Sequence, residues 1–162
     1  MITPLIQSPR RSKFVADDCS ADSVFGYLSH LEGTYPGFRA WFHDKVISPL
    51  SSEERAIFVK WVNERPSGIA IAKRSSEERK LCTLWVDPAA RTSGVGADLG
   101  ARAFEWLGTS KPLFTVPEER IEEFRGLLNR WDFHPRQALV GYYRSKKAEY
   151  VFNGQLKPKV SA

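Results

Sequence analysis

Cysteine is scarce in this 162-residue sequence, and its scarcity excludes several kinds of site. Cys19 and Cys82 are far apart and form no C-x-x-C pair, so they predict neither a zinc site nor a disulfide framework. No apolar run approaches the roughly 18 residues of a membrane-spanning helix, and residues 1–13 lack the features of a secretory signal. We therefore expect a cytoplasmic protein without a membrane partner, in which both cysteines are packing residues.

Acidic residues are the minority, with 19 Asp and Glu against 24 Lys and Arg and a net charge of +5. This balance favours an anionic partner, but it does not distinguish a phosphorylated cofactor from nucleic acid or an acidic protein. With 42% hydrophobic and 12% aromatic residues, the chain can bury one sizeable core. We expect a single domain over residues 1–162, with loose ends at 1–11 and 153–162.

Hydrophobic periodicity predicts both helices and strands. Three strand-like runs joined by short polar turns, at 56–62, 68–74 and 80–86, indicate an antiparallel meander. The other expected strands are 12–18, 111–116, 138–144 and 149–154, and the expected helices are 20–31, 35–46, 95–107 and 117–131. A meander that leads into a β-α-β crossover predicts an α/β (α+β) fold, with a mixed, mostly antiparallel central sheet of about six to seven strands and helices on both faces.

Two glycines stand at the start of the expected helix 95–107, in the stretch VDPAARTSGVGADLG. Glycine destabilises a helix interior by roughly 1 kcal/mol relative to alanine, so Gly94 and Gly96 suggest that a ligand approaches the backbone closely. A helix start offers unpaired N–H groups to a phosphate, and Arg91 would add a positive charge. An ordinary strand-to-helix turn is the alternative. Leu99 excludes the GxGxxG fingerprint, and no Walker GK[ST] sequence is present.

The same stretch resembles the acyl-coenzyme A binding segment of the Gcn5-related N-acetyltransferase (GNAT) family, in which a strand leads through V-x-P into R/Q-x-x-G-x-G/A and a helix. The order of the expected elements, from about Phe14 to about Phe152, is also similar to the order in that family. The resemblance covers nearly the whole chain and implies the GNAT fold. The residues that match the motif are Val86, Pro88, Arg91, Gly94, Gly96 and Ala97, followed by Leu99 on an apolar helix face.

The resemblance implies an N-acetyltransferase, which moves an acetyl group from acetyl-CoA to a primary amine by direct attack in a ternary complex. In the family, loop amides hold the coenzyme A pyrophosphate and the preceding strand pairs with the pantetheine arm. An N–H of that strand, here nearest Val86, polarises the thioester carbonyl. The implied cofactor-binding residues are Leu84, Trp85, Val86, Arg91, Thr92, Ser93, Gly94, Val95, Gly96 and Ala97.

The sequence departs from the family pattern at the catalytic acid. Many relatives carry a tyrosine there, in a segment like L-Y-E-K-x-G-F, to protonate the departing thiolate. Aligning LLNRWDF by Phe133 puts Leu128 at the tyrosine and Asp132 at the glycine. Tyr142 and Tyr143 are the nearest substitutes, and on the expected strand at most one of them can point into the cleft. Packing of both is the alternative.

The expected helix 35–46 contains candidates for the catalytic base and for the wall of the acceptor pocket. His43 is a candidate base, because imidazole titrates near neutral pH, and a surface position on an amphipathic helix is its alternative. Tyr35 and Trp41 are candidates for the wall of the acceptor pocket, because aromatic faces suit an alkylammonium group or a flat base. The inward face of a helix is the alternative for these aromatic residues. Asp87 is expected to have a structural role in its turn.

The acceptor stays open between a small amine, a protein amine and aminoacyl-tRNA. Two other functions also stay open: an acyl-CoA-binding module of the same fold that lacks efficient catalysis, and a nucleic-acid-binding protein. A homodimer is a further possibility.

Overall fold

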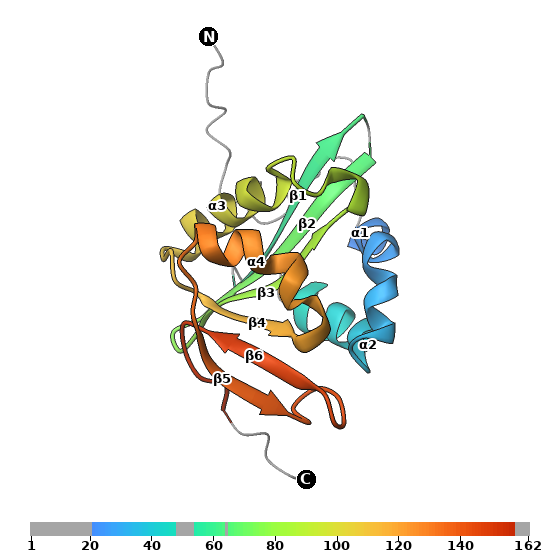
Figure 1. Ribbon diagram of the computed structural model, residues 1–162. Coiled ribbons are helices and arrows are strands. Elements are labelled where there is room, and N and C mark those ends of the chain that lie inside the picture. The colour runs from blue at the N-terminus through green and yellow to red at the C-terminus, as the bar shows by residue number, and fades with distance from the viewer. Residues whose placement is uncertain (1–20, 48–53, 64, 158–162) are drawn as a thin grey trace.

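The computed structural model describes residues 21–47, 54–63 and 65–157 (Figure 1). Its helices are α1 (Ala21–Leu28), α2 (Phe38–Trp41), α3 (Val95–Leu107) and α4 (Ile121–Arg130). Shorter helical segments are η1 (Ser29–Gly33), the π-helical η2 (Phe42–Ile47), η4 (Pro88–Ala90) and η5 (Glu118–Arg120). The strands are β1 (Arg55–Val62), β2 (Arg65–Arg74), β3 (Arg79–Val86), β4 (Leu113–Pro117), β5 (Pro135–Val140) and β6 (Ala148–Phe152).

The described strands form one six-stranded sheet in the order β1-β2-β3-β4-β6-β5. Strands β1, β2 and β3 make the expected antiparallel meander. The chain then crosses through α3 to β4, which pairs with β3 in parallel, and β6 and β5 complete the sheet in antiparallel pairs. The prediction of a mixed, mostly antiparallel sheet with helices on both faces is confirmed.

Side chains of the meander alternate between two hydrophobic cores, because successive strand residues point to opposite faces of a sheet. Ala56 and Phe58 of β1 pack in the core that α3 and α4 cover. Ile57 and Val59 pack in the second core, with α1, α2 and η2. Figure 1 shows α3 and α4 crossing in front of the sheet. Because helices cover both faces of the sheet, most residues of β1 are apolar.

Helix α3 presents the apolar stripe that the sequence predicts. Val95, Leu99, Ala103 and Leu107 recur every four residues, and all four are buried. Gly108 ends the helix with a φ of 73°, a left-handed conformation that suits glycine. The helix therefore runs from the end of β3 back across the sheet as one packed element.

The expected strand 138–144 is wrong in its second half. Strand β5 ends at Val140, and Tyr142 and Tyr143 lie in the turn that leads to β6. Gly141 adopts a φ of 80°, a conformation outside the strand region, so the chain reverses there.

Two of the expected helices begin at other residues or change their helical geometry. The expected helix 35–46 begins at Phe38 and continues in π-helical geometry from Phe42. The expected helix 117–131 opens with the 3₁₀ turn η5 before α4. The expected strand 12–18 lies outside the described residues.

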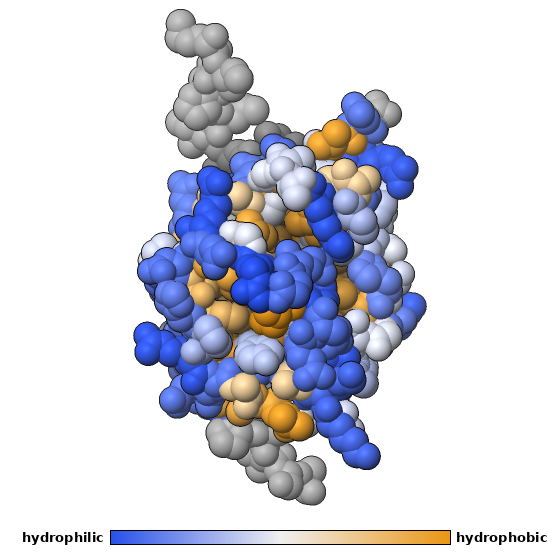
Figure 2. Space-filling view, viewed as in Figure 1, coloured by the Kyte–Doolittle hydropathy of each residue, from blue (hydrophilic) through white to orange (hydrophobic). Residues whose placement is uncertain are grey.

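The face seen in Figure 2 is mostly hydrophilic, with hydrophobic side chains in patches between the charged ones. Among the described residues, the exposed large hydrophobic side chains are Tyr27, Trp61, Val62 and Val140. Within the same ranges, no helix is both long enough and apolar enough to cross a membrane.

Candidate active site

Strand β3 leads into a turn whose backbone is fixed by local contacts. Asp87 Oδ1 accepts a hydrogen bond from the Ala89 N–H at 3.0 Å, which is the structural role expected for this residue. Further along, Thr92 and Gly94 adopt φ values of 67° and 88°. These two left-handed residues turn the chain into the start of α3.

Within the described parts of the chain, the first N–H groups of α3 have no acceptor. Asp98 is the first residue of the helix whose N–H donates to a carbonyl oxygen four residues earlier, Gly94 O, at 3.0 Å. Across the residues that the structure describes, the N–H groups of Val95, Gly96 and Ala97 have no hydrogen-bond partner. Unpaired amides at a helix start form an anion-binding site.

The two loop glycines have different surroundings. A Cβ atom on Gly94 would meet no atom within 4 Å, so the backbone there is open to a ligand. A Cβ atom on Gly96 would lie 2.8 Å from Leu127 Cδ1 on α4. The missing side chain of Gly96 therefore allows α3 to approach α4, whereas the backbone at Gly94 has open space beside it.

Arg91 is tied to helix α4 rather than held over the loop. Its Nη2 atom lies 2.9 Å from Glu123 Oε1, and Arg120 binds the same carboxylate. Burial opposes ionisation of Glu123, but Arg120 and Arg91 together lower the pKa of its carboxyl group. In this arrangement the charge of Arg91 is partly neutralised by Glu123.

Strands β3 and β4 separate next to this loop. They pair only at Lys80 with Leu113 and at Leu81 with Phe114. From there to its end, the described part of β3, which includes the predicted positions 84–86, pairs only with β2. An unpaired strand edge can bind an extended chain that carries amide groups. The loop and this edge fit the diphosphate and the amide-bearing arm of coenzyme A.

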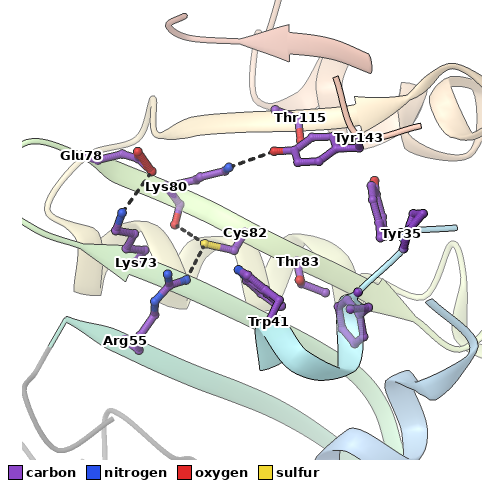
Figure 3. A pocket seen from close by; sticks show the side chains of 13 residues that line it. Tyr35, Trp41, Arg55, Lys73, Glu78, Lys80, Cys82, Thr83, Thr115 and Tyr143 are labelled. Atoms are coloured by element: carbon purple, nitrogen blue, oxygen red, sulfur yellow. Dashed lines mark hydrogen bonds and ion pairs between the residues drawn. The ribbon is translucent and has the colours of Figure 1, made fainter. Parts of the chain in front are cut away.

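A β-bulge interrupts β3 where the two strands separate. Ile71 pairs with Thr83 and Ala72 with Leu81, which leaves Cys82 as an extra residue. The bulge lets Cys82 and Thr83 line the same cavity, which has a volume of about 310 Å³ (Figure 3). The lining residues are Tyr35, Pro36, Gly37, Phe38, Trp41, Arg55, Lys73, Glu78, Lys80, Cys82, Thr83, Thr115 and Tyr143.

One end of this cavity is basic. Arg55 Nη1 donates to Cys82 Sγ at 3.2 Å, and Lys73 Nζ lies 3.7 Å from Glu78 Oε1. In Figure 3, Arg55, Lys73 and Glu78 gather on the side away from Tyr35. Burial raises the pKa of the Cys82 thiol although Arg55 and a lysine nearby favour the thiolate. Burial therefore favours the neutral thiol of Cys82 over the thiolate.

The other end is built from two tyrosines with different partners. Tyr35 Oη donates to Glu149 Oε1 at 3.1 Å, and Lys80 Nζ donates to Tyr143 Oη at 3.4 Å. The two rings meet edge to face, with centroids 5.6 Å apart. Burial raises the pKa of Glu149, Tyr35 and Tyr143. Lys80 opposes that rise at Tyr143, because an ammonium group favours the phenolate.

The structure brings together some of the predicted catalytic and acceptor residues and not others. Tyr35, Trp41 and Tyr143 line the cavity. Tyr142 lies outside it, and its hydroxyl donates to Lys157 O at 2.9 Å. The ring of His43 packs 5.5 Å from that of Phe25, also outside the cavity, so its position gives no support for a catalytic role.

Leu128 and Asp132 are the residues that the predicted alignment puts at the tyrosine and the glycine of the family segment. Leu128 is buried in the core beneath α4 and has no polar group for the site. Asp132 has a φ of 55°, the backbone conformation that a glycine would adopt easily.

Sequence reasoning missed Arg55, Lys80, Cys82 and Glu149. The first three reach the cavity through strand register and a bulge, which alternation of residue types does not reveal. Glu149 carried a signal in the sequence, because it is a charged residue at the start of the apolar run EYVF. In the structure it is only 2% exposed. A carboxyl group at such a position usually has a specific partner.

Comparison with known proteins gives matches of structure. No protein-family model and no curated protein matches the sequence. Nourseothricin acetyltransferase superposes with a TM-score of 0.55 at 16% identity, over 61% of this chain and 64% of that one. An acetyltransferase of the GNAT family from Streptococcus pneumoniae gives 0.51 at 18%, over 65% and 68%. A Bacillus subtilis acetyltransferase in complex with CoA gives 0.51 at 11%, over 70% and 86%.

These matches show that the chain has the GNAT acetyltransferase fold. The match with nourseothricin acetyltransferase spans 64% of that protein, which is less than two thirds of its length.

Proposed function

We propose that the protein is an acetyl-CoA-dependent N-acetyltransferase that acts on a primary amine. The observation that supports this most strongly is the start of α3, where unpaired N–H groups and the open Gly94 adjoin the free edge of β3. The fold agrees with this proposal, and so does the CoA complex of the similar Bacillus subtilis acetyltransferase.

Two segments would hold acetyl-CoA. The amides of residues 92–97 would bind the diphosphate, residues 84–86 would pair with the amide-bearing arm, and the N–H nearest Val86 would donate to the thioester carbonyl. When bound, acetyl-CoA supplies an acyl carbon activated for attack by an amine. The cavity lies beside the bulge of β3, next to residues 84–86. It would receive the acceptor.

Tyr35 and Glu149 form the proposed route for the acceptor's proton. An aliphatic amine is mostly ammonium at neutral pH and must lose a proton before it attacks. The ammonium gives its proton to Tyr35 Oη while Tyr35 passes its own proton to Glu149 Oε1, 3.1 Å away. Tyr35 contacts the acceptor, and Glu149 acts through Tyr35.

Tyr143 is the proposed acid for the departing thiolate, in place of the hydroxyl that Leu128 lacks. It lines the cavity, and its Oη atom accepts a hydrogen bond from the Lys80 ammonium. That ammonium stabilises the phenolate that remains after Tyr143 has donated its proton. Burial favours the protonated hydroxyl before the reaction.

Thiol release from acetyl-CoA tests the proposal. We expect saturable release with at least one member of a panel of small amines, peptides with free amines and aminoacyl-tRNA, and one added acetyl group on that acceptor.

Buried Leu128 favours a second candidate, an acyl-CoA-binding module without efficient catalysis. Binding of coenzyme A with no release above hydrolysis on any acceptor would establish the module instead, and failure to bind coenzyme A would contradict both.

A further inference from the structure

The cavity beside the β-bulge has an excess of positive charge. Its lining contains three basic side chains, Arg55, Lys73 and Lys80, and one carboxylate, Glu78. Glu78 lies beside Lys73 Nζ, at 3.7 Å. In the part of the chain that the structure describes, neither Arg55 nor Lys80 has a carboxylate within ion-pair distance. Among the described residues, these two cations therefore line the cavity without a counter-ion.

Arg55 is the more deeply buried of these two cations, and none of its described contacts is with an anion. It is only 8% exposed, and a buried guanidinium is costly unless an anion balances it. Its described side-chain contacts are Cys82 Sγ, 3.2 Å from Nη1, and the ring of Trp41, 5.7 Å from Cζ. A neutral thiol and an aromatic face provide no negative charge. The guanidinium fork matches the two oxygens of a carboxylate or a phosphate.

The opposite end of the cavity suits the remainder of an amine acceptor. Tyr35 and Tyr143 stand at that end in Figure 3, and Trp41 forms a wall between the two ends. Aromatic faces attract an ammonium group, and the two hydroxyls are the proposed sites of proton transfer. A volume of about 310 Å³ is at the small end of the range for small-molecule sites.

We infer that the acceptor is a small amine that also carries an acidic group, with Arg55 and Lys73 binding the acid and Tyr35 and Tyr143 facing the amine. This inference rests on the proposed function. Carboxylate and phosphate share the required chemistry, and both are included in the test.

Binding without coenzyme A tests the inference in matched pairs. The probes are the common L-amino acids, β-alanine and 4-aminobutyrate, each against its carboxamide, and phosphoethanolamine against ethanolamine. Dissociation constants come from calorimetry after a thermal-shift screen. We expect at least one acidic amine to bind about 10- to 100-fold more tightly than its neutral partner, the range for hydrogen bonds to a charged group. The pairs that show this difference in affinity identify whether the cavity prefers a carboxylate or a phosphate.

Two variants separate the charge of Arg55 from its packing. Arg55→Gln removes the cation, and we expect it to bring the acidic amine down to the affinity of its neutral partner. Its melting temperature should stay the same or rise, because an uncompensated buried charge is lost. Arg136→Gln is the matched control, because Arg136 is exposed on β5 outside the cavity. It should bind every probe as the wild type does.

The outcomes distinguish this inference from the proposed function. Equal binding of acidic and neutral partners by the wild type overturns the inference, whether or not Arg55→Gln folds. Unchanged acid preference in folded Arg55→Gln also overturns it. If coenzyme A binds to the same samples while no acid preference exists, the inference fails and the proposed function stands. If acidic amines are preferred and coenzyme A does not bind, the proposed function fails.

Discussion

At the scale of single residues, two tyrosine hydroxyls reach the cavity with opposite partners. Tyr35 donates to a carboxylate, Glu149, whereas Tyr143 accepts from an ammonium, Lys80. A neighbouring carboxylate favours removal of a proton from the acceptor, and a neighbouring ammonium favours donation of a proton to a leaving group. These partners assign the base pathway to Tyr35 and the acid to Tyr143.

Removal of the Tyr143 hydroxyl tests this assignment. We expect Tyr143→Phe to lower kcat about 100-fold, within the usual range for loss of a general acid, with little change in coenzyme A affinity. Tyr142→Phe should lower kcat far less, because the Tyr142 hydroxyl binds Lys157 O outside the cavity. Steady-state thiol release measures both variants. Equal losses in the two would contradict the assignment of Tyr143 as the acid.

Glu149 predicts a pH dependence of stability. Burial raises the pKa of its carboxyl group in the folded protein above the ordinary value of 4.5. The folded state therefore binds this proton more tightly than the unfolded state does. The stability contributed by the protonated group is complete below pH 4.5 and is lost as the pH rises through the folded-state pKa. The Glu149→Gln variant does not lose this stability as the pH rises, because glutamine does not titrate.

Denaturant titrations at several pH values measure the free energy of unfolding of both proteins. We expect the variant to gain on the wild type as the pH rises from 4.5 toward neutrality, and the difference to level off above the folded-state pKa. A difference that stays constant over this range would show that Glu149 does not titrate with a raised pKa. Glu122→Gln is the control, because that side chain is exposed and pairs with Arg125 on the surface.

Individual residues also show what the sequence could and could not predict. Tyr35 and Trp41 were predicted to form a pocket wall because they belong to an aromatic stretch, and both line the cavity. Arg55 was not found, because a basic residue at the start of a strand is usually solvated. Only the contacts of its buried side chain with Cys82 and Trp41 separate it from a surface arginine.

At the scale of elements, α3 and α4 are held together where glycines replace side chains. A Cβ atom on Gly100 would lie 2.4 Å from Cζ2 of Trp131. The Trp131 ring is fixed in turn by Phe104, Phe114 and Phe133, with centroid separations of 5.1, 6.3 and 5.3 Å. The ring cannot move aside without disturbing this cluster.

Two glycine-to-alanine variants test this packing. Gly100→Ala should cost about 1–3 kcal/mol of unfolding free energy, the usual cost of overpacking a core. Gly126→Ala, in the middle of α4 with no atom within 4 Å of its Cβ position, should instead gain about 0.5–1 kcal/mol from helix propensity. Chemical denaturation measures both changes. A gain in both variants would contradict the close contact between Gly100 and Trp131.

Elements with clear periodicity were predictable, and irregular ones were not. The stripe of α3 and the meander β1 to β3 follow from the spacing of apolar residues. The turn at Gly141 ended β5 early, because one left-handed residue outweighs the strand propensity of the two tyrosines after it. The bulge at Cys82 left no local signal, because it depends on pairing with β2.

At the scale of the whole molecule, one strand joins the two parts of the proposed site. The end of β3 leads into the loop before α3, and the bulge near its middle lines the cavity, on the side of the sheet that α2 covers. Separation of β3 from β4 leaves the edge between these points unpaired. The order of elements predicted the loop and the fold, whereas the charge of the cavity emerges only from the folded arrangement.

The central claim is that the amides at the start of α3 bind the diphosphate of coenzyme A. A titration of the ¹⁵N-labelled protein with coenzyme A, followed by NMR of the backbone amides, tests it most directly. We predict the largest shifts at residues 92–97, abolished in Gly94→Asp by charge repulsion and retained in the neutral Gly94→Asn, which tolerates the same left-handed backbone. Amide signals of 92–97 that stay unchanged at saturating coenzyme A would contradict the account.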